Sequence, residues 1–267
     1  MSTRVALITG AGRGIGLATA RRFLGEGWRV ALIELDAETL ATGMAALAAP
    51  EATLALACDV SDPAQVRDAV GRAAAHFGRV DALVNNAGIA VFKPMLETTL
   101  EEWNRILAVN LTGPFLMTQA VAPVMAEGGG GAIVNITSIS GLRSSTLRSA
   151  YGTSKAGLAH LTQQQAVELA GLGIRVNAVA PGPVETAMAK AVHTPAIRAD
   201  YHAAIPLNRY GLESELADAI YFLCSERASY ITGQVLAVDG GFEATGIGLT
   251  TLRAERQDGR RETGSGE

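Results

Sequence analysis

A tyrosine, a lysine and a serine stand at spacings that could support proton transfer. Tyr151 and Lys155 lie four residues apart in a stretch with helical periodicity, so they share one helix face. Ser138 precedes Tyr151 by thirteen residues and ends an apolar, strand-like run. A free phenol has a pKa of about 10, and an ammonium at about 4 Å stabilises the phenolate by roughly 4 kcal/mol at an effective dielectric constant of 20. The three side chains therefore predict a general acid/base beside a hydroxyl that holds the reacting oxygen.

A glycine-rich turn near the N-terminus could hold a phosphate group. Residues 9–16 read Thr-Gly-Ala-Gly-Arg-Gly-Ile-Gly and join a short apolar run to a helical pattern. Glycines let the chain turn tightly and let its backbone approach a pyrophosphate without a Cβ in the way. The anion can then rest on the free N–H groups of the new helix. An ordinary strand–helix turn is the alternative, but the position in the first unit favours a dinucleotide site.

Glu34 ends the second strand-like run, twenty residues after Gly14. A carboxylate there can accept hydrogen bonds from both hydroxyls of an adenosine ribose, and it would repel a 2′-phosphate. The other interpretation is a surface glutamate at a strand end. The spacing favours the ribose contact, and with it NAD over NADP.

These residues fall within a regular alternation of strand-like and helix-like segments. Short aliphatic runs occur at residues 5–9, 30–34, 54–57, 82–85, 133–137, 174–179 and 235–238. Helical periodicity occurs at residues 17–24, 37–47, 64–77, 100–125, 150–169 and 213–223. Apolar strands that alternate with helices predict a parallel sheet covered on both faces. We expect one doubly wound α/β domain of the Rossmann type, with about seven strands, over residues 1–248 and a polar tail over 249–267.

Composition narrows the class of protein. Hydrophobic residues make up 48% and charged residues 18% of the 267, which is globular composition. A net charge of −4 argues against nucleic-acid or membrane-surface partners. Cys58 and Cys224 lack redox or metal spacing, so we expect buried free thiols and a cytoplasmic location. The four histidines show no paired spacing, so no metal site is expected, and the N-terminal apolar run is too short for a signal peptide or membrane span.

The motifs together resemble the short-chain dehydrogenase/reductase family. Its pattern Thr-Gly-x-x-x-Gly-x-Gly is matched from Thr9 to Gly16. The other matching motifs are Asn85-Asn86-Ala87-Gly88, Asn110, Ser138, Tyr151-x-x-x-Lys155 and Pro181-Gly182, in the family's order and spacing. The resemblance covers about residues 4–248. It implies a nucleotide-binding oxidoreductase that moves a hydride between nicotinamide and an alcohol or carbonyl carbon.

The resemblance also implies a role for each catalytic residue. Tyr151 would be the general acid/base, and Lys155 would lower the pKa of its phenol and hold the nicotinamide ribose. Ser138 would bind the substrate oxygen. Asn110 would hold a water molecule that extends a proton relay from Lys155; the alternative is an asparagine that bonds within its own helix.

The resemblance further predicts which residues contact the cofactor. The phosphate loop and second strand would contribute Gly10, Gly12, Arg13, Gly14, Ile15, Gly16, Glu34 and Leu35. Later segments would contribute Asp59, Val60, Asn86, Ala87, Gly88, Tyr151, Lys155, Pro181, Gly182, Val184 and Thr186. Asp59-Val60 would contact adenine, although it could instead belong to a helix N-cap region. Val184 and Thr186 would bind the carboxamide.

Cofactor preference depends on opposing charges in the resemblance. Family members that prefer NADP often carry a basic residue where this chain has Arg13, and usually a second one where it has Leu35. We expect the carboxylate of Glu34 to outweigh the single arginine. NAD is therefore the expected cofactor and NADP the alternative.

The expected substrate is a small polar molecule such as a polyol, sugar or hydroxy acid. Residues 185–209 would form a loop that closes over the site and excludes water. Arg143, Arg148, His193 and His202 lie in or near the expected pocket, and Arg148, three residues before Tyr151, is the candidate substrate contact. The alternative for each is a solvated surface group.

Two other functions stay open from the sequence. An NADP-linked 3-oxoacyl or ketone reductase would share all of these motifs, although Glu34 counts against it. A non-catalytic nucleotide-sensing or scaffold protein on the same fold would have no need of the four catalytic residues. By resemblance the protein would be a homotetramer, with interfaces on residues 100–125, 150–169 and 235–242.

Overall fold

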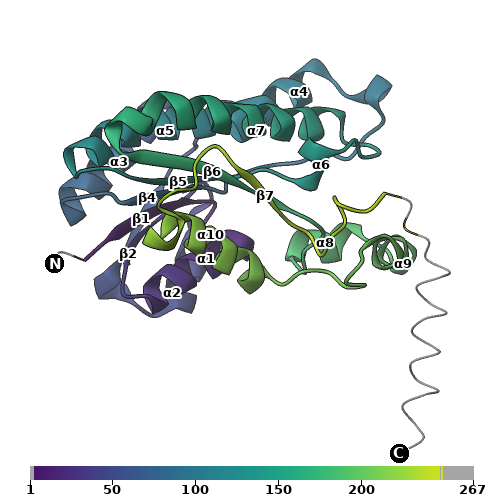
Figure 1. The fold of residues 1–267 in the computed structure, drawn as a ribbon, viewed down its shortest axis with the longest axis horizontal. Helices are drawn as coiled ribbons and strands as arrows, with labels where there is room; N and C mark the ends of the chain where they lie inside the picture. The colour runs from purple at the N-terminus through teal and green to yellow at the C-terminus, as the bar shows by residue number, and fades with distance from the viewer. Residues whose placement is uncertain (1–2, 247, 249–267) are drawn as a thin grey trace, which may run out of the picture.

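The computed structural model describes residues 3–246 and 248, and their strands form one parallel sheet in the order β3-β2-β1-β4-β5-β6-β7. The strands are β1 (Val5–Thr9), β2 (Arg29–Glu34), β3 (Thr53–Ala57), β4 (Ala82–Asn85), β5 (Gly131–Ile136), β6 (Ile174–Pro181) and β7 (Val235–Val238). Each matches a predicted run to within two residues at either end. The predicted doubly wound α/β fold is confirmed (Figure 1).

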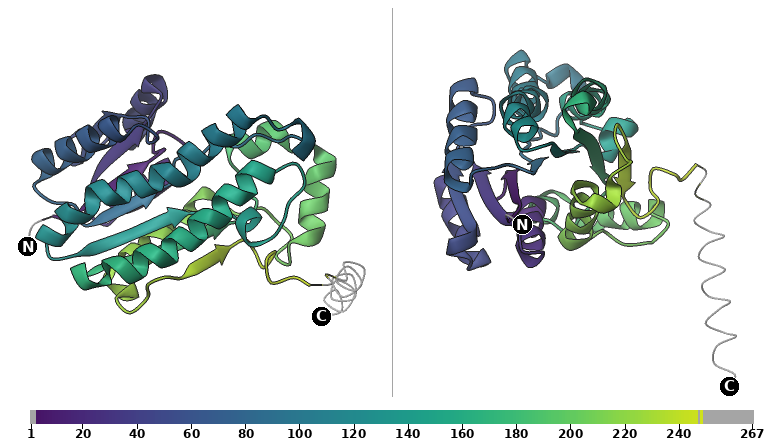
Figure 2. Two further views of the ribbon diagram at one scale, coloured as in Figure 1. Left: turned by 90° about the horizontal axis from the view of Figure 1, so that it is seen from above. Right: turned by 60° about the vertical axis from the view of Figure 1, so that its left-hand side comes forward.

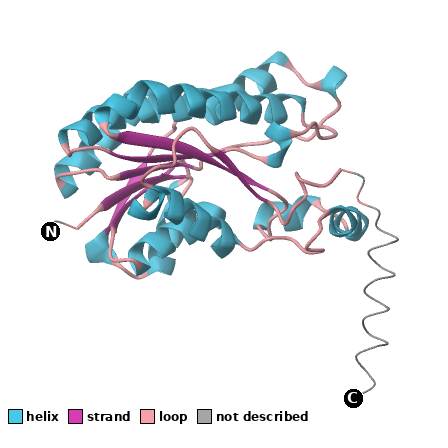
Figure 3. Ribbon diagram, viewed as in Figure 1, coloured by secondary structure: helices cyan, strands magenta, loops and turns pink. Residues whose placement is uncertain are grey.

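Helices cover both faces of the sheet (Figures 1 and 3). One face carries α1 (Gly14–Gly25), α2 (Ala37–Leu47) and α10 (Glu213–Cys224). The other carries α3 (Pro63–Phe77), α5 (Gly113–Glu127) and α7 (Ser149–Leu169). The sheet forms one hydrophobic core with the helices on each face, and alternate residues of β1 enter the two cores. Val5 packs with α3 and α5, whereas Ala6 packs with α1. The strand is therefore apolar from Val5 to Ile8, as expected for a parallel strand buried on both faces.

The helical stretch predicted at residues 100–125 is three elements in the structure. They are α4 (Leu100–Leu107), a π-helical turn (Ala108–Thr112) and α5. Pro114 has no N–H to donate to the carbonyl of Asn110, and this interrupts the α-helical pattern where the π turn lies. Asn110 therefore lies in an irregular turn rather than inside a uniform helix.

Residues 100–127 also form the one helical run among the described residues that is long and apolar enough to cross a membrane. Half of its apolar window is buried inside the protein, and α5 packs on α3, β4 and β5. The run is accounted for as a core helix.

Residues 185–209, predicted to be a loop, contain two short helices, α8 (Ala187–Val192) and α9 (Pro195–Ala204). The Thr186 side chain caps α8 and the Thr194 side chain caps α9, each by accepting a backbone N–H. Both helices lie beyond the carboxyl ends of the strands (Figures 1 and 2). A third short helix, α6 (Ile139–Leu142), follows β5.

The polar tail predicted at residues 249–267 lies outside the described residues. The two predicted free thiols, Cys58 and Cys224, are both buried and unpaired with each other.

Candidate active site

A cleft of about 790 Å³ opens at the carboxyl ends of the central strands. β1 and β4 are neighbours in the sheet, but the chain continues from them into helices on opposite faces. The cleft lies at the ends of these two strands. Doubly wound sheets place their ligands at such a switch point. We name three parts of the lining by the group that each is expected to hold: a phosphate end at the glycine-rich loop, a ribose end at Glu34 and a substrate end at Arg148.

Ser138, Tyr151 and Lys155 meet on one wall of this cleft. Ser138 follows β5 and caps α6, where its hydroxyl accepts the N–H of Ser140 at 3.1 Å. The Ser138 side chain is also hydrogen-bonded to the phenol of Tyr151. The Lys155 ammonium lies 5.8 Å from the centre of the Tyr151 ring. The structure thus brings together the three side chains that the sequence grouped.

Burial and nearby groups shift the pKa values of Tyr151 and Lys155. Burial raises the pKa of Tyr151, and the hydrogen bond from Ser138 and the positive charge of Arg148 oppose that rise. Lys155 was expected to be the cation that lowers this pKa, but its Nζ donates to the carbonyl of Ile136 at 2.7 Å. Burial also lowers the pKa of Lys155 to about 8. The charge of Arg148 thus opposes the rise in the pKa of Tyr151, and the effect of Lys155 on that pKa stays a prediction.

Asn110 lies directly behind the lysine and is buried. Its Oδ1 accepts the N–H of Ile89, and its Nδ2 donates to the Ile89 carbonyl at 2.9 Å and to the Ser154 hydroxyl at 3.0 Å. All three partners belong to other segments, so Asn110 joins the loop after β4 to α7. A Cβ at Gly88 would lie 3.3 Å from Asn110 Oδ1 and 3.4 Å from Lys155 Nζ. The water-holding role of Asn110 stays a prediction.

The phosphate loop divides its glycines between two tasks. Gly10 and Gly14 line the cleft with φ of 62° and 61°, in the left-handed region that glycine adopts without strain. Gly12 and Gly16, which the sequence assigned to the cofactor, do not line it. A Cβ on Gly12 would lie 2.7 Å from Thr39, and one on Gly16 would lie 2.2 Å from the carbonyl oxygen of Gly10. These two glycines allow close packing beneath the loop instead.

Asn86 explains how the loop is held. Its Nδ2 donates to the carbonyls of Thr9 and Gly10, both at 3.0 Å, while the Thr9 hydroxyl accepts the N–H groups of Asn86 and Ala87. The end of β4 is thereby tied to the end of β1. Ala87 and Gly88 follow directly and line the cleft.

At the ribose end the carboxylate of Glu34 accepts the backbone N–H groups of Leu35, at 2.9 Å, and of Gly12, at 3.4 Å. Asp36 lies beside it in the cleft lining. Hydrogen bonds from Thr39 lower the pKa of Asp36, and the positive charge of Arg13 adds to that effect. Two carboxylates therefore lie at the ribose end of the cleft lining.

Asp59 and Val60 line the cleft, and Asp59 is not the helix cap. The N-cap of α3 is Asp62. Asp59 instead accepts the Ser61 hydroxyl at 2.6 Å and pairs with Arg105 at 3.1 Å. Arg105, which the sequence did not identify, also lines the cleft.

The remaining predicted cofactor contacts also line the cleft; they are Arg13, Ile15, Leu35, Pro181, Gly182, Val184 and Thr186. Val184 forms an isolated bridge with Gly211, and the Thr186 hydroxyl accepts the N–H of Ala189 at 3.2 Å. The residues after β6 are thus fixed at the edge of the cleft.

The substrate end is lined by Arg148 and His193, as expected, and also by Phe92 and Tyr201. Phe92 could have been found from its place just after β4, because loops at the carboxyl ends of parallel strands face the ligand. Arg143 and His202 are not in the lining. Arg143 is exposed and pairs with Glu243, which leaves it as a surface group.

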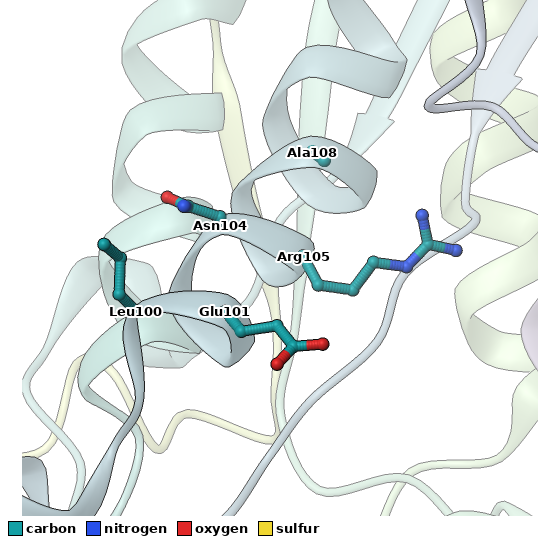
Figure 4. Close-up of a pocket in the computed structure, with 5 residues that line it drawn as sticks. All are labelled: Leu100, Glu101, Asn104, Arg105 and Ala108. Carbon is teal, nitrogen blue, oxygen red and sulfur yellow. The ribbon is translucent and has the colours of Figure 1, made fainter.

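A second depression lies on the face of α4, lined by Leu100, Glu101, Asn104, Arg105 and Ala108. In Figure 4, Leu100 and Asn104 point away from Arg105, which extends to the other side of the helix. α4 and the first residue of the π turn supply every lining residue, and no pair of groups there resembles an acid/base set. The cleft at the strand ends is the candidate active site.

Known proteins resemble this chain along nearly its whole length. A family model described as Enoyl-(Acyl carrier protein) reductase matches residues 10–243. The chain is 43% identical to the 2-(R)-hydroxypropyl-CoM dehydrogenase of Xanthobacter autotrophicus, over 91% of this chain and 99% of that protein. It is 40% identical to a 3-oxoacyl-[acyl-carrier-protein] reductase of Thermotoga maritima, over 89% and 97%. It is 42% identical to the D-threitol dehydrogenase of Mycolicibacterium smegmatis, over 90% and 92%.

Solved structures show the same likeness. Levodione reductase superposes with a TM-score of 0.88 at 37% identity, covering 92% of this chain and all of that one (100%). A xylitol dehydrogenase with bound NAD⁺ superposes with a TM-score of 0.86 at 32% identity, covering 90% and 99%. The likeness therefore extends from the sequence to the complete fold.

Proposed function

Because the chain belongs to the short-chain dehydrogenase/reductase family, we propose that it moves a hydride between NAD and the CH–OH or carbonyl carbon of a small polar substrate. The chain is an oxidoreductase by this membership. The observation that carries the proposal is the meeting of Ser138, Tyr151 and Lys155 on one wall of a cleft that begins at a glycine-rich loop. A non-catalytic nucleotide-binding role finds no support, because these relatives are named as dehydrogenases and reductases.

The residues of the cleft fit a nicotinamide dinucleotide. Gly10 and Gly14 leave the loop free of side chains where a pyrophosphate would approach, and Glu34 stands where an adenosine ribose would end. Nicotinamide supplies the chemistry of accepting or giving the hydride at the substrate carbon. The protein's own task is to hold the substrate oxygen and to move its proton.

Ser138, Tyr151 and Lys155 each perform a separate part of this task. In the oxidation direction Ser138 hydrogen-bonds the substrate hydroxyl, and Tyr151 takes its proton as the hydride leaves carbon. Lys155, whose pKa burial lowers to about 8, can exchange a proton with its surroundings near neutral pH. Asn110 lies beside that ammonium and would extend the relay inward. In the reduction direction the same phenol gives the proton back.

NAD is the cofactor that the ribose end favours. The carboxylates of Glu34 and Asp36 outnumber the guanidinium of Arg13, so a 2′-phosphate would meet net negative charge. The rival is an NADP-linked 3-oxoacyl reductase, which the Thermotoga relative and Arg13 support. Absorbance of the reduced nicotinamide, measured across a panel of alcohols with NAD and NADP in parallel, separates the two. Turnover with NADP but not with NAD would contradict the proposal, and so would the failure of every alcohol in the panel to be oxidised.

A homotetramer in the cytoplasm completes the proposal. Apolar side chains are exposed on α4, α5, α7 and the edge strand β7, which are the segments where interfaces were predicted; examples are Leu100, Phe115, Val167 and Leu236. Burial between subunits would remove them from water. The two buried free thiols, Cys58 and Cys224, are compatible with a reducing compartment. Fractionation of cells that express the protein tests the location.

A further inference from the structure

Arg148 is a cation in the cleft that has no carboxylate partner among the residues that the structure describes. Its guanidinium donates to the Ser140 hydroxyl at 3.2 Å and lies 5.0 Å from the centre of the Phe92 ring. Neither neighbour carries a charge. By contrast, Arg143 and Arg209 each pair with a glutamate. Arg148 is therefore held in place without being neutralised.

Arg148 also lies near Tyr151, the proposed acid/base. Arg148 stands one turn before Tyr151 at the start of α7, and residues three apart on a helix are neighbours. Arg148, Tyr151 and His193 all line the same cleft. A substituent a few bonds from the reacting carbon could therefore reach the guanidinium.

Acidic residues are unevenly distributed along the cleft lining. The acidic lining residues belong to the cofactor end: Glu34 and Asp36 at the ribose end, Asp59 where an adenine contact is predicted, and Glu213 beside Gly14 of the phosphate loop. Glu185, which lies near the substrate end, is paired with Arg198. The substrate end of the cleft is thus positive.

His193 can add a second donor beside the arginine. Its Nδ1 is 3.0 Å from the Tyr210 hydroxyl, and its ring stacks on Tyr201 with 5.1 Å between centres. When Tyr210 donates to Nδ1, the proton of the neutral ring lies on Nε2, which can then donate to a ligand. The two lining residues, Arg148 and His193, are thus fixed by aromatic neighbours in a region that lacks a free carboxylate.

From this arrangement we propose that the cleft recognises an oxyanion on the substrate, carboxylate or sulfonate, through Arg148 assisted by His193. The natural substrates are then hydroxy acids or the corresponding oxo acids with a short spacer between the two groups. Arginine suits this task because its planar N–H fork binds two oxygens of one anion. The inference rests on the proposed dehydrogenase function and names its substrate class.

The test compares matched substrates with NAD in the full-length protein. Secondary hydroxy acids of increasing chain length, the corresponding hydroxy sulfonates and the uncharged amides of the same acids are oxidised by the wild type and by three variants. Arg148→Gln removes the charge but keeps a donor for Ser140, whereas Ser140→Ala removes that hydrogen bond and keeps the charge. Arg143→Gln is the control for loss of a nearby surface charge.

We expect Arg148→Gln to raise the KM of the anionic substrates by roughly 10- to 100-fold, with little change in the KM of the amides. Ser140→Ala and Arg143→Gln should keep the preference for the anion. Butanoate or propane-1-sulfonate should inhibit the wild type competitively and Arg148→Gln much less, and the better inhibitor identifies which oxyanion is used.

Equal KM values for acids and amides in the wild type would overturn the inference. So would equal losses for both substrate types in Arg148→Gln and Ser140→Ala, because that result would mean that Arg148 only braces the loop. Failure of the proposed function would look different, since no alcohol, charged or neutral, would then reduce NAD.

Discussion

At the residue scale, the candidate site combines a buried phenol with two cations that have different partners. Burial alone makes Tyr151 a weaker acid. The Arg148 charge and the Ser138 hydrogen bond oppose this effect, while the ammonium of Lys155 is directed to a backbone carbonyl. Catalysis by the phenol therefore needs stabilisation of its anion, and the pKa values of Tyr151 and Lys155 should be measurable properties of the folded protein.

Lys155 should make stability depend on pH in a defined window. Burial lowers its pKa to about 8 from 10.5. Between those values the unfolded chain holds a proton that the folded protein has released, so stability rises with pH from about 8 to 10.5, by up to about 1.4 kcal/mol per pH unit. We expect the free energy of unfolding of the wild type to rise relative to that of Lys155→Met across this range.

Urea denaturation of both proteins at matched pH values measures this difference. The comparison is needed because burial raises the pKa of Cys58 to about 11 and of Cys224 to about 12, and these thiols lower stability as pH rises above their ordinary value. Both proteins contain them, so their effect cancels. Parallel curves for the two proteins would show that Lys155 is not desolvated.

Glu34 should determine the choice of cofactor. Replacing Glu34 with Ala removes an acceptor for the ribose hydroxyls and the repulsion of a 2′-phosphate. We expect the ratio of kcat/KM for NAD to that for NADP to fall by roughly 10- to 100-fold. Glu38→Ala, an exposed carboxylate on α2 outside the cleft lining, is the control. A wild type that already prefers NADP would show that the assignment is wrong.

At the scale of elements, periodicity was enough to place the strands and the long helices, because those segments bury apolar residues in a regular order. It could not find the π turn at Asn110, which depends on the missing N–H of Pro114, nor α8 and α9, which are short and held by threonine caps. Strand-end and helix-turn spacing was enough to group Ser138, Tyr151 and Lys155, whereas the roles predicted for them and for Asn110 came from the resemblance to the family. The pairing of Arg148 with Phe92 depends on a long-range contact that no spacing reveals.

The phosphate loop and α1 provide a matched test at this scale. A Cβ on Gly16 would lie 2.2 Å from a backbone oxygen, whereas Gly25, at the end of the same helix, has no atom within 4 Å of that position. Gly16→Ala should lower stability by about 1–3 kcal/mol and weaken NAD binding. Gly25→Ala should leave binding unchanged and add up to about 1 kcal/mol of stability.

Thermal unfolding and an NAD titration by fluorescence give both readouts. If Gly16→Ala bound NAD as tightly as the wild type, the loop would not depend on the close packing that the structure shows.

At the scale of the whole molecule, every candidate catalytic group lies at the carboxyl edge of one sheet. That sheet has a hydrophobic core on each of its two faces. The helices α2, α3 and α5 contribute no lining residues, whereas α7 carries both candidate catalytic residues and a proposed subunit interface. Its first turns hold Tyr151 and Lys155, while its last turns expose the side chain of Val167. An assembly through α7 would therefore also steady the helix that carries the catalytic residues.

Val167 offers a direct test of that assembly, because its side chain on α7 is 79% exposed in the single chain. Val167→Glu should bury a charge in the proposed interface and reduce the particle mass below that of four chains, as measured by analytical ultracentrifugation. Arg67→Glu, on exposed α3 surface away from the proposed interfaces, should leave the mass unchanged. If the wild type sediments as a monomer, the proposed interface is wrong.

The most direct test of the central claim is Tyr151→Phe, which removes one hydroxyl and keeps the ring. If the phenol carries the substrate proton, kcat should fall by roughly 10²- to 10⁴-fold while the Kd for NAD, from fluorescence titration, stays within error of the wild type. Turnover within a few-fold of the wild type would contradict the account, because the proton would then be moving through another group.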